Sequence, residues 1–384
     1  MKRIFKNLDK PLLIVTILLF VVGLIAVFSS SNVTAYMSHA VSPYNYFLKQ
    51  LGFLIVGLIL AFVMIKMSTK TYGVLSWGLL LIVIASLVCL LIIGHSKNQA
   101  ISWFDLGPIS IQPSEFAKVI SIIWLAVYYE TNLKGLNSYV KSLFPIGICI
   151  LVALLIFIQP DLGTTIIYAI IVGTMFMASP IPKFMKFKTV FAFLGLIVFA
   201  GLVYLSAGKG ILQDRQSERF NFRNPCSRLL TTGNQVCNGY IAINNGGLTG
   251  VGLGNSTQKY LYLPEPYTDF IFAVIIEEMG VLFGIGILLL YIFLLYRILD
   301  IGNKSKTNRG KAMCYGVAIY IFLHIAVNLL GLFGLMPMTG VPLPFMSYGG
   351  SFTICLIAAL TVVQRVSVEN GYSRETQKRR KRRT

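Results

Sequence analysis

The chain has 384 residues, of which 56% are hydrophobic and 12% are charged, and its formal net charge is +19. Soluble domains carry about 25% charged residues, so this composition excludes an ordinary soluble fold and indicates a polytopic membrane protein. The basic residues fall mostly between and after apolar runs, a pattern of membrane topology that argues against nucleic acid as a partner.

Ten apolar runs predict transmembrane helices, because most are near the ~20 residues that cross a bilayer. In chain order they lie at 11–30, 47–66, 72–94, 114–130, 143–158, 162–179, 189–206, 268–296, 312–335 and 350–366. The first run resembles a signal sequence, but it is long and lacks a small-x-small cleavage site, so we interpret it as a retained span. The expected fold is an all-α integral membrane protein with ten transmembrane helices.

The charges orient these helices. With the N-terminus in the cytoplasm, every inside segment carries at least two Lys or Arg, which predicts an N-in, C-in topology. The same assignment leaves one large extracellular loop, 207–267. We expect a single membrane domain, 1–366, followed by a basic cytoplasmic tail, 367–384. The tail is either a disordered segment that touches anionic lipid or a docking site for a cytoplasmic partner.

Polar residues gather at the predicted outer ends of several spans. They occur at Gln112–Lys118, at Gln159–Thr164, at Thr268-Asp269 and at Pro337–Gly350. Charged residues near hydrocarbon are costly, and irregular backbone at membrane depth is tolerated only inside protein or beside water. The grouping therefore predicts a cavity that opens to the outside.

Three carboxylates in these segments have both structural and functional interpretations. Glu115 and Lys118 are close enough on a helix to form a structural ion pair, or Lys118 meets a substrate phosphate and Glu115 orients it. Asp161 follows a proline and can cap the next helix, or it holds a sugar hydroxyl or a cation. Thr268 can cap the helix that follows Asp269, whereas Asp269 itself is placed to act as a general base.

The electrostatics of Asp269 remain open at this stage. A helix dipole would lower the pKa of its carboxyl group, and desolvation would raise it. Glu277 and Glu278 should lie deeper along the same helix, about 12 Å further on at 1.5 Å per residue. We interpret those two as packing residues or a proton sink.

The predicted outer loop combines arginines with glycines. Arg215, Arg219, Arg223 and Arg228 precede the glycine-rich run 244–255. No βαβ context surrounds that run, so it is not a dinucleotide fingerprint. The arginines suit phosphate oxygens, or they form a solvated basic loop facing lipid headgroups. Cys226 and Cys237 share this loop and are either a disulfide or two free thiols. No metal-ligand spacing appears.

Four segments together resemble the SEDS family of shape, elongation, division and sporulation proteins, the FtsW and RodA group. They are QPSEFAK at 112–118, QPDLGT at 159–164, LPEPYTDFIF at 263–272 and Pro337–Ser351. The resemblance covers nearly the whole chain. It implies ten transmembrane helices and polymerisation of peptidoglycan from lipid II outside the cytoplasmic membrane. Asp269 occupies the place of the presumed catalytic residue.

The resemblance also implies substrate-binding positions. Within the four segments these are Glu115, Lys118, Asp161, Thr268 and Ser347. Two further matches, the run 219–225 and Gly233-Asn234-Gln235, add Arg219 and Gln235. Two positions depart from the family pattern, because Ser102 replaces a usual arginine and Tyr267 replaces a common histidine. Lys97 or a loop arginine would have to supply the cation that Ser102 lacks.

The sequence therefore supports two functional hypotheses. The first is a peptidoglycan glycosyltransferase, of the division type by its basic tail and its LPEPYTDFIF run, acting at the outer face of the cell membrane. Its expected partners are lipid II, a class B penicillin-binding transpeptidase and other divisome or elongasome membrane proteins, with a divalent cation that pyrophosphate would attract. The alternative is a lipid II flippase, since charged residues within spans and broken helices are also typical of transporters.

Overall fold

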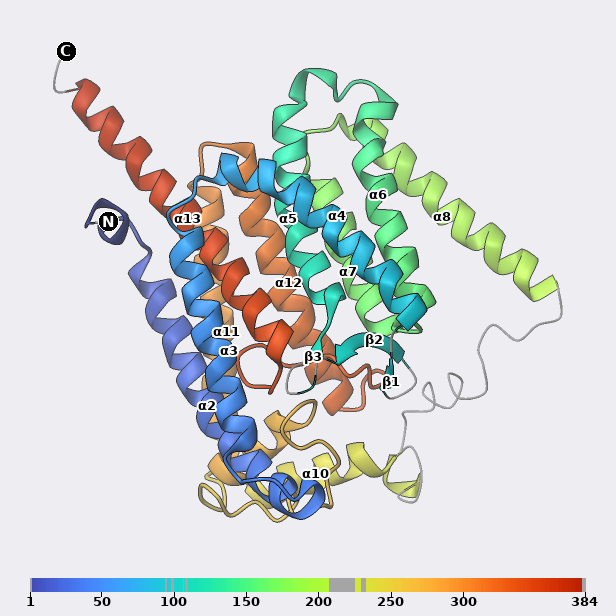
Figure 1. Cartoon of the computed structure of the whole chain (residues 1–384), viewed down its shortest axis with the longest axis vertical. Coiled ribbons are helices and arrows are strands. Elements are labelled where there is room, and N and C mark those ends of the chain that lie inside the picture. Colours follow the sequence, from blue (N-terminus) through green and yellow to red (C-terminus); the bar gives the residue numbers. More distant parts are fainter. Residues whose placement is uncertain are drawn as a thin grey trace.

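The computed structural model describes residues 2–93, 95–97, 100–105, 107, 110–206, 225–228 and 233–381. These residues form a bundle of long helices with a small sheet and a short helix at one end (Figure 1). The elements are α1 (Lys2–Lys6), α2 (Lys10–His39), α3 (Asn45–Met64), α4 (Thr69–Ile93), β1 (His95–Lys97), β2 (Ala100–Asp105), β3 (Ser110–Ile111), α5 (Pro113–Thr131), η1 (Leu133–Gly135), α6 (Tyr139–Ile158), α7 (Leu162–Ala178), α8 (Lys183–Ser206), η2 (Pro225–Arg228), α10 (Asn234–Gly246), α11 (Ile271–Asn303), α12 (Asn308–Leu332) and α13 (Gly350–Lys381).

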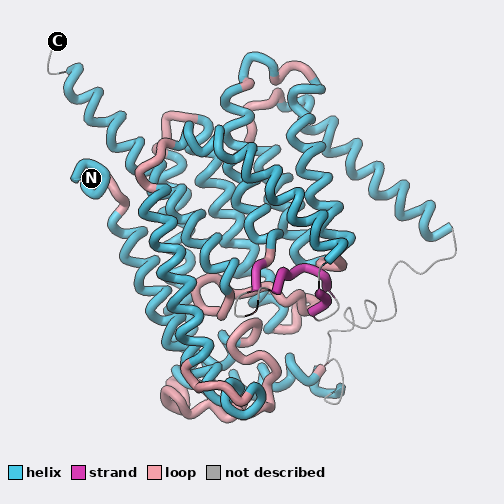
Figure 2. Tube along the Cα trace, in the orientation of Figure 1, coloured by secondary structure: helices cyan, strands magenta, loops and turns pink. Residues whose placement is uncertain are grey.

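The two ends of the bundle differ. The first and the last described residues lie at one end of the bundle, which we call the terminal end, and α10 lies at the opposite one, which we call the α10 end (Figure 1). The irregular segments and the strands are concentrated toward the α10 end (Figure 2). The polar motifs of the sequence are thus gathered where the backbone is least regular.

Each of the ten predicted apolar runs coincides with a helix. Within the described residues, seven helices are long and apolar enough to cross a membrane, namely α2, α3, α4, α6, α11, α12 and α13. The shorter α7 is apolar as well. The chain is therefore a multi-pass membrane protein, as its composition predicts.

A small antiparallel sheet departs from the all-α prediction. Its strand order is β1-β2-β3, with His95 opposite Trp103 and Phe104 opposite Ile111. Ser102 lies in β2, buried, and its hydroxyl has no hydrogen-bond partner among the described residues. Ser102 is thus enclosed by the described part of the chain.

Helix α5 is the centre of the bundle. It packs against α4, α6, α7, α12 and α13, and nearly all of its side chains are buried. Most of these are apolar, but Glu115 and Lys118 occupy its first turns. Because α5 is enclosed by other helices, its charged residues face protein and not lipid, which is the arrangement that a membrane requires.

Helix α11 is two helices. Gly280 has φ 85° and ψ 165°, a conformation that breaks the helix and suits glycine. A Cβ on Gly284 would lie 3.1 Å from Ile276 Cγ1 and 3.5 Å from Phe272 Cζ. In a straight helix, residues 272 and 284 would be about 18 Å apart along the axis. The first segment, 271–279, therefore folds back beside the second, 281–303.

This hairpin corrects the prediction for Glu277 and Glu278. The second segment runs from the α10 end to the terminal end, so the first segment runs toward the α10 end. The two glutamates consequently lie nearer the α10 end than Asp269 does, and not deeper in the bundle. The loop 247–252 completes the backbone at the break, since Val251 N donates to Glu277 O (2.9 Å) and Gly252 N donates to Glu278 O (2.9 Å).

The basic tail is helical through Lys381, where disorder was one expectation. Its early turns pack against the N-terminal segment: Ser367 Oγ donates to Asn7 O (3.2 Å), and the Arg3 guanidinium lies 4.6 Å from the centre of the Tyr372 ring. The tail is rich in Glu, Gln, Lys and Arg, which favour helix, so α13 continues past its apolar part.

Candidate functional site

The segment that carries Asp269 is held through its backbone. Tyr348 N donates to Tyr267 O (2.9 Å), Ser347 Oγ donates to Thr268 O (2.6 Å), and Asn328 Nδ2 donates to Asp269 O (3.0 Å). Ser347 is buried, so its hydroxyl positions the chain and is not presented to solvent. The proline- and glycine-rich run before α13 therefore acts as a frame for residues 267–269.

The carboxylate of Asp269 is partly buried and unengaged. Among the described residues, neither of its oxygens accepts a hydrogen bond, and Oδ2 would lie 3.7 Å from a Cβ on Gly340. Burial raises the pKa of Asp269 to about 6, and the Glu265 carboxylate adds to the rise. Desolvation is the larger of these two causes, so the shift in the pKa of Asp269 is upward.

The predicted N-cap at Thr268 is wrong. Helix α11 begins at Ile271, its cap is Phe270, and the Thr268 hydroxyl donates to Glu265 O (3.1 Å) instead. The turn-forming run of residues before Phe270 delays the start of the helix. Asp269 therefore lies before the first helical turn.

Asp161 and Gln112 bring two further motifs to the same place. Asp161 Oδ1 accepts from Thr164 N (3.0 Å), which confirms that Asp161 caps α7. Its Oδ2 accepts from Gln112 Nε2 (3.3 Å). A Cβ on Gly163 would lie 2.9 Å from Thr339 Cβ, so α7 begins directly against the residue that precedes Gly340. The four polar motifs of the sequence therefore converge beside Asp269.

Lys118 is the centre of a buried polar triad. Lys118 Nζ is 2.7 Å from Glu115 Oε1 and 3.0 Å from His324 Nε2, and Lys118 has no exposed surface. The ion-pair interpretation of Glu115 and Lys118 thus describes the observed geometry. Glu115 Oε2 has no hydrogen-bond partner among the described residues.

The sequence reasoning missed His324 and Asn328, although the signal was present. Both are polar residues inside the predicted span 312–335, and such residues usually have partners in the bundle interior. Their partners are Lys118 for His324, and the backbone of Asp269 and of Val341 for Asn328. Neither residue belongs to a motif, and only the three-dimensional arrangement connects them to the site.

The outer-loop candidates are placed in part. Arg219 and most of the other loop arginines lie outside the described residues, as does the side chain of Lys97. Gln235 is half-buried on the first turn of α10, on the same face as Gly239, whose Cβ position is 3.0 Å from the Phe270 ring. Cys226 and Cys237 form a disulfide, with Cα atoms 4.9 Å apart, which ties η2 to α10.

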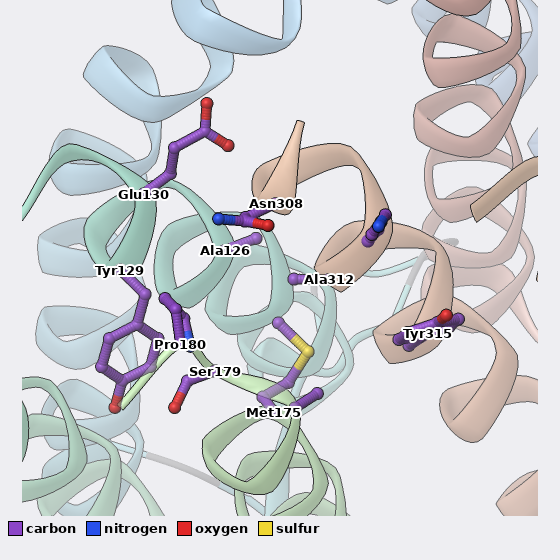
Figure 3. Close-up of a pocket in the computed structure, with 11 residues that line it drawn as sticks. Ala126, Tyr129, Glu130, Met175, Ser179, Pro180, Asn308, Ala312 and Tyr315 are labelled. Atoms are coloured by element: carbon purple, nitrogen blue, oxygen red, sulfur yellow. The ribbon is translucent and has the colours of Figure 1, made fainter. Parts of the chain in front are cut away.

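A cavity of about 150 Å³ lies away from these residues, at the terminal end (Figure 3). Glu130, Asn308 and Tyr315 are among the residues that line it, from the ends of α5 and α12. It contains none of the predicted site residues, so it does not test the prediction of an outward-opening cavity.

Comparisons with known proteins place these observations in a family. The model of the cell cycle protein family of FtsW, RodA and SpoVE matches residues 10–372. The chain is 34% identical to a probable peptidoglycan glycosyltransferase FtsW of Bacillus subtilis, over 99% of this chain and 95% of that protein. It is 35% identical to stage V sporulation protein E of the same organism, over 95% and 98%.

Solved structures share the fold. A chain from a study of the structural coordination of polymerization and crosslinking by a peptidoglycan synthase complex superposes with a TM-score of 0.73 and 25% identity, over 94% of this chain and 98% of that one. The rod shape determining protein RodA of Thermus thermophilus has a TM-score of 0.65 and 24% identity, over 94% and 96%. The latter likeness concerns the fold alone.

Proposed function

Because the chain belongs to the cell cycle protein family of FtsW, RodA and SpoVE, we propose that it is a peptidoglycan glycosyltransferase that polymerises lipid II into glycan strands. The observation that carries the assignment of the site is the carboxylate of Asp269. It is unengaged, partly desolvated and has a pKa of about 6, close to the pH at which a general base must work. The surrounding motifs supply polar groups for a sugar-bearing substrate.

The proposed reaction is a single displacement. The 4-hydroxyl of the acceptor sugar attacks the anomeric carbon of the donor, Asp269 takes the hydroxyl proton, and the bond to undecaprenyl pyrophosphate breaks. One displacement inverts the anomeric centre. The departing pyrophosphate needs positive charge, and Arg219 is the candidate that contacts it. The buried Lys118, which is paired with Glu115, does not contact the pyrophosphate. It acts on the pyrophosphate only through its electrostatic field.

The polar residues around Asp269 have proposed roles in binding. Gln112 and Asp161 present an amide and a carboxylate that can hold sugar hydroxyls, and Gln235 on α10 adds a second amide. Thr268 and Ser347 hold the backbone of the segment that carries Asp269, through hydrogen bonds from their hydroxyls. A divalent cation would be recruited by the pyrophosphate, whose negative charge attracts one. The described residues contain no group of three His, Cys, Asp or Glu side chains that could hold a metal ion.

The proposed setting is the cytoplasmic membrane, with ten spans, both termini inside and Asp269 accessible from the outer face. The charge distribution supports this orientation. The membrane domain would be 1–366, with the large loop 207–267 outside and the basic tail 367–384 inside. The similarity to a chain of a peptidoglycan synthase complex supports a class B transpeptidase as partner, beside other division or elongation proteins.

Purified protein with labelled lipid II tests this function. The wild type should form glycan polymer, and Asp269→Ala should form none while eluting as a folded monodisperse species. Asp300→Asn is the matched control, because Asp300 is a carboxylate at the terminal end that pairs with Arg297 and Lys304. Polymer from Asp269→Ala at the wild-type rate would refute the role of Asp269.

The flippase alternative makes a different prediction. Lipid II already on the accessible outer face of vesicles should be polymerised by a glycosyltransferase, whereas a flippase would move it without making polymer. Movement of lipid II across the bilayer with no polymer in the same preparation would favour the transporter.

A further inference from the structure

Two adjacent acidic residues end the first segment of α11, at the point where the chain reverses. Glu277 has 0% exposed surface and Glu278 has 3%, so both carboxylates are removed from water. Burying a carboxylate is costly unless it is paired and hydrogen-bonded. The proposed reaction assigns nothing to either residue.

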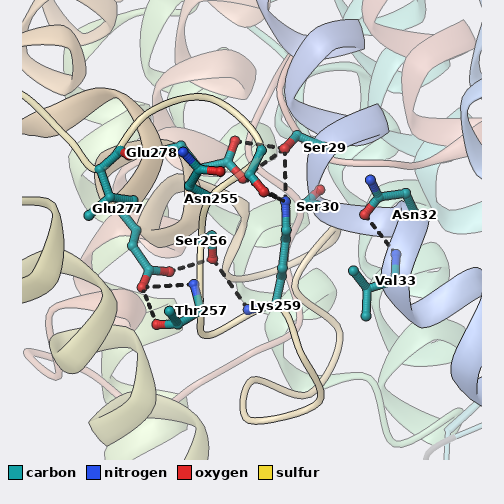
Figure 4. A network of polar contacts seen from close by, with 12 residues as sticks. Ser29, Ser30, Asn32, Val33, Asn255, Ser256, Thr257, Lys259, Glu277 and Glu278 are labelled. Atoms are coloured by element: carbon teal, nitrogen blue, oxygen red, sulfur yellow. Dashed lines mark hydrogen bonds and ion pairs between the residues drawn. The ribbon is translucent and has the colours of Figure 1, made fainter.

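Glu278 is one half of a buried ion pair. Its Oε1 lies 2.9 Å from Lys259 Nζ and both of its oxygens lie 2.7 Å from Ser29 Oγ (Figure 4). Lys259 Nζ also donates to Gly254 O (2.7 Å). The pair therefore connects three parts of the chain, namely α2, the loop before α11 and the hairpin turn.

Glu277 is surrounded by donors from the same loop. Its carboxylate accepts from the hydroxyls of Ser256 and Thr257, from Thr257 N (3.3 Å) and Gln258 N (3.3 Å), and from Asn245 Nδ2 (3.2 Å). Together these backbone, hydroxyl and amide donors fix the loop to the carboxylate of Glu277. Figure 4 shows Glu277 and Glu278 engaging this loop through separate sets of contacts.

The contacts of Glu277 and Glu278 hold one end of the short helical segment 271–279, and Asp269 lies just before its other end. The segment 271–279 is too short to be stable alone, so its position is determined by what holds its ends. One end is held by Asn328 and Ser347 at the backbone of residues 268–269. The other is held by Glu277 and Glu278. Between them, Ile271 to Ile276 are all buried, so a shift at one end is transmitted to the other.

We propose that Glu277, Glu278 and Lys259 form a clamp at the hairpin turn that positions Asp269 to take the proton from the acceptor hydroxyl. The inference rests on the proposed glycosyl transfer, and it makes these three positioning residues and not catalytic ones. A buried ion pair is weak evidence of a stabilising role, because apolar residues of similar volume often stabilise as well or better. A requirement for an exact position of the segment accounts for the clamp where stability alone does not.

The test compares Lys259→Met/Glu278→Met and Glu277→Gln with the wild type. Replacing both members of the pair avoids leaving one charge buried and alone. We expect kcat per folded molecule to fall about 100-fold, the loss that a misplacement of about 1 Å can cause, with KM for lipid II changed less than twofold. The acid limb of the pH–rate profile should also move to lower pH, because a loosened segment admits water to Asp269.

The control pair is Arg309→Met/Glu130→Met at the terminal end, where the two side chains are 3.4 Å apart. Whatever it does to thermal stability, it should leave kcat per folded molecule and the acid limb unchanged. Hydrogen exchange of residues 270–276 gives a readout that needs no activity, and it should accelerate in the clamp variants and not in the control.

The outcomes separate the clamp from the proposed function. Clamp variants with wild-type kcat, acid limb and exchange would overturn the clamp. A wild type that makes no polymer would overturn the proposed function, and exchange would then still decide whether the clamp holds the segment that carries Asp269.

Discussion

The pH dependence of polymerisation follows directly from the burial of Asp269. An aspartate with its ordinary pKa of 3.8 would be ionised at any pH at which the protein is assayed, whereas burial brings the pKa of Asp269 to about 6. At pH 5, a group with a pKa of 6 is about one-tenth ionised, against about nine-tenths for a pKa of 3.8. If Asp269 must be ionised to accept the proton, the rate at pH 5 should be about a tenth of the rate at pH 7.5.

The assay is the initial rate of polymer formation from labelled lipid II between pH 4.5 and 8, at saturating and at low substrate. The low-substrate profile reports the free enzyme, so its acid limb should have its midpoint near 6. Glu265→Gln is the matched perturbation. Since the Glu265 carboxylate contributes to the raised pKa of Asp269, its removal should move the midpoint to lower pH. The high-pH rate should stay unchanged.

Two results would refute the reasoning. A rate that stays constant down to pH 5 would mean that Asp269 is not a base with a raised pKa. A limb with its midpoint near 6 that persists in Asp269→Glu at an unchanged position would assign the titration to another group or to the substrate.

Two further predictions concern stability. Because the folded state raises the pKa of Asp269, the associated stability is full below its unfolded value and is lost as pH rises through about 6. Asp269→Asn should therefore be more stable than the wild type at pH 7.5, by about 1–2 kcal/mol after allowing for partial exposure, with the gap closing at pH 4 in thermal unfolding. Removing the disulfide by Cys226→Ser/Cys237→Ser opens a short loop and should cost about 3 kcal/mol by the chain-entropy estimate; equal melting temperatures with and without reductant would contradict this.

Much of the fold could be predicted because a membrane constrains the amino-acid composition of the segments that cross it. All ten apolar runs coincide with helices, since a bilayer requires long apolar segments with internally satisfied backbones. The contact of Glu115 with Lys118 and the capping by Asp161 also followed from spacing and local chemistry. These features depend on neighbours in the sequence, which periodicity reveals.

Most of the features that the sequence did not predict depend on contacts between residues far apart in the chain. The reversal at Gly280 depends on loop 247–252 supplying backbone partners across more than twenty residues, and a single glycine within an apolar run gives little notice of it. The missing cap at Thr268 has a local cause, because its hydroxyl donates to Glu265 O, three residues earlier. In the triad, Lys118 and His324 are 206 residues apart in the sequence. Long-range pairings of this kind leave no local pattern.

The grip on residues 267–269 uses main-chain carbonyl oxygens, which every amino acid possesses. None of these three hydrogen bonds uses a side-chain atom of residues 267–269. A substitution at Asp269 should therefore leave all three in place, so that a loss of activity reports the missing carboxylate and not a displaced backbone.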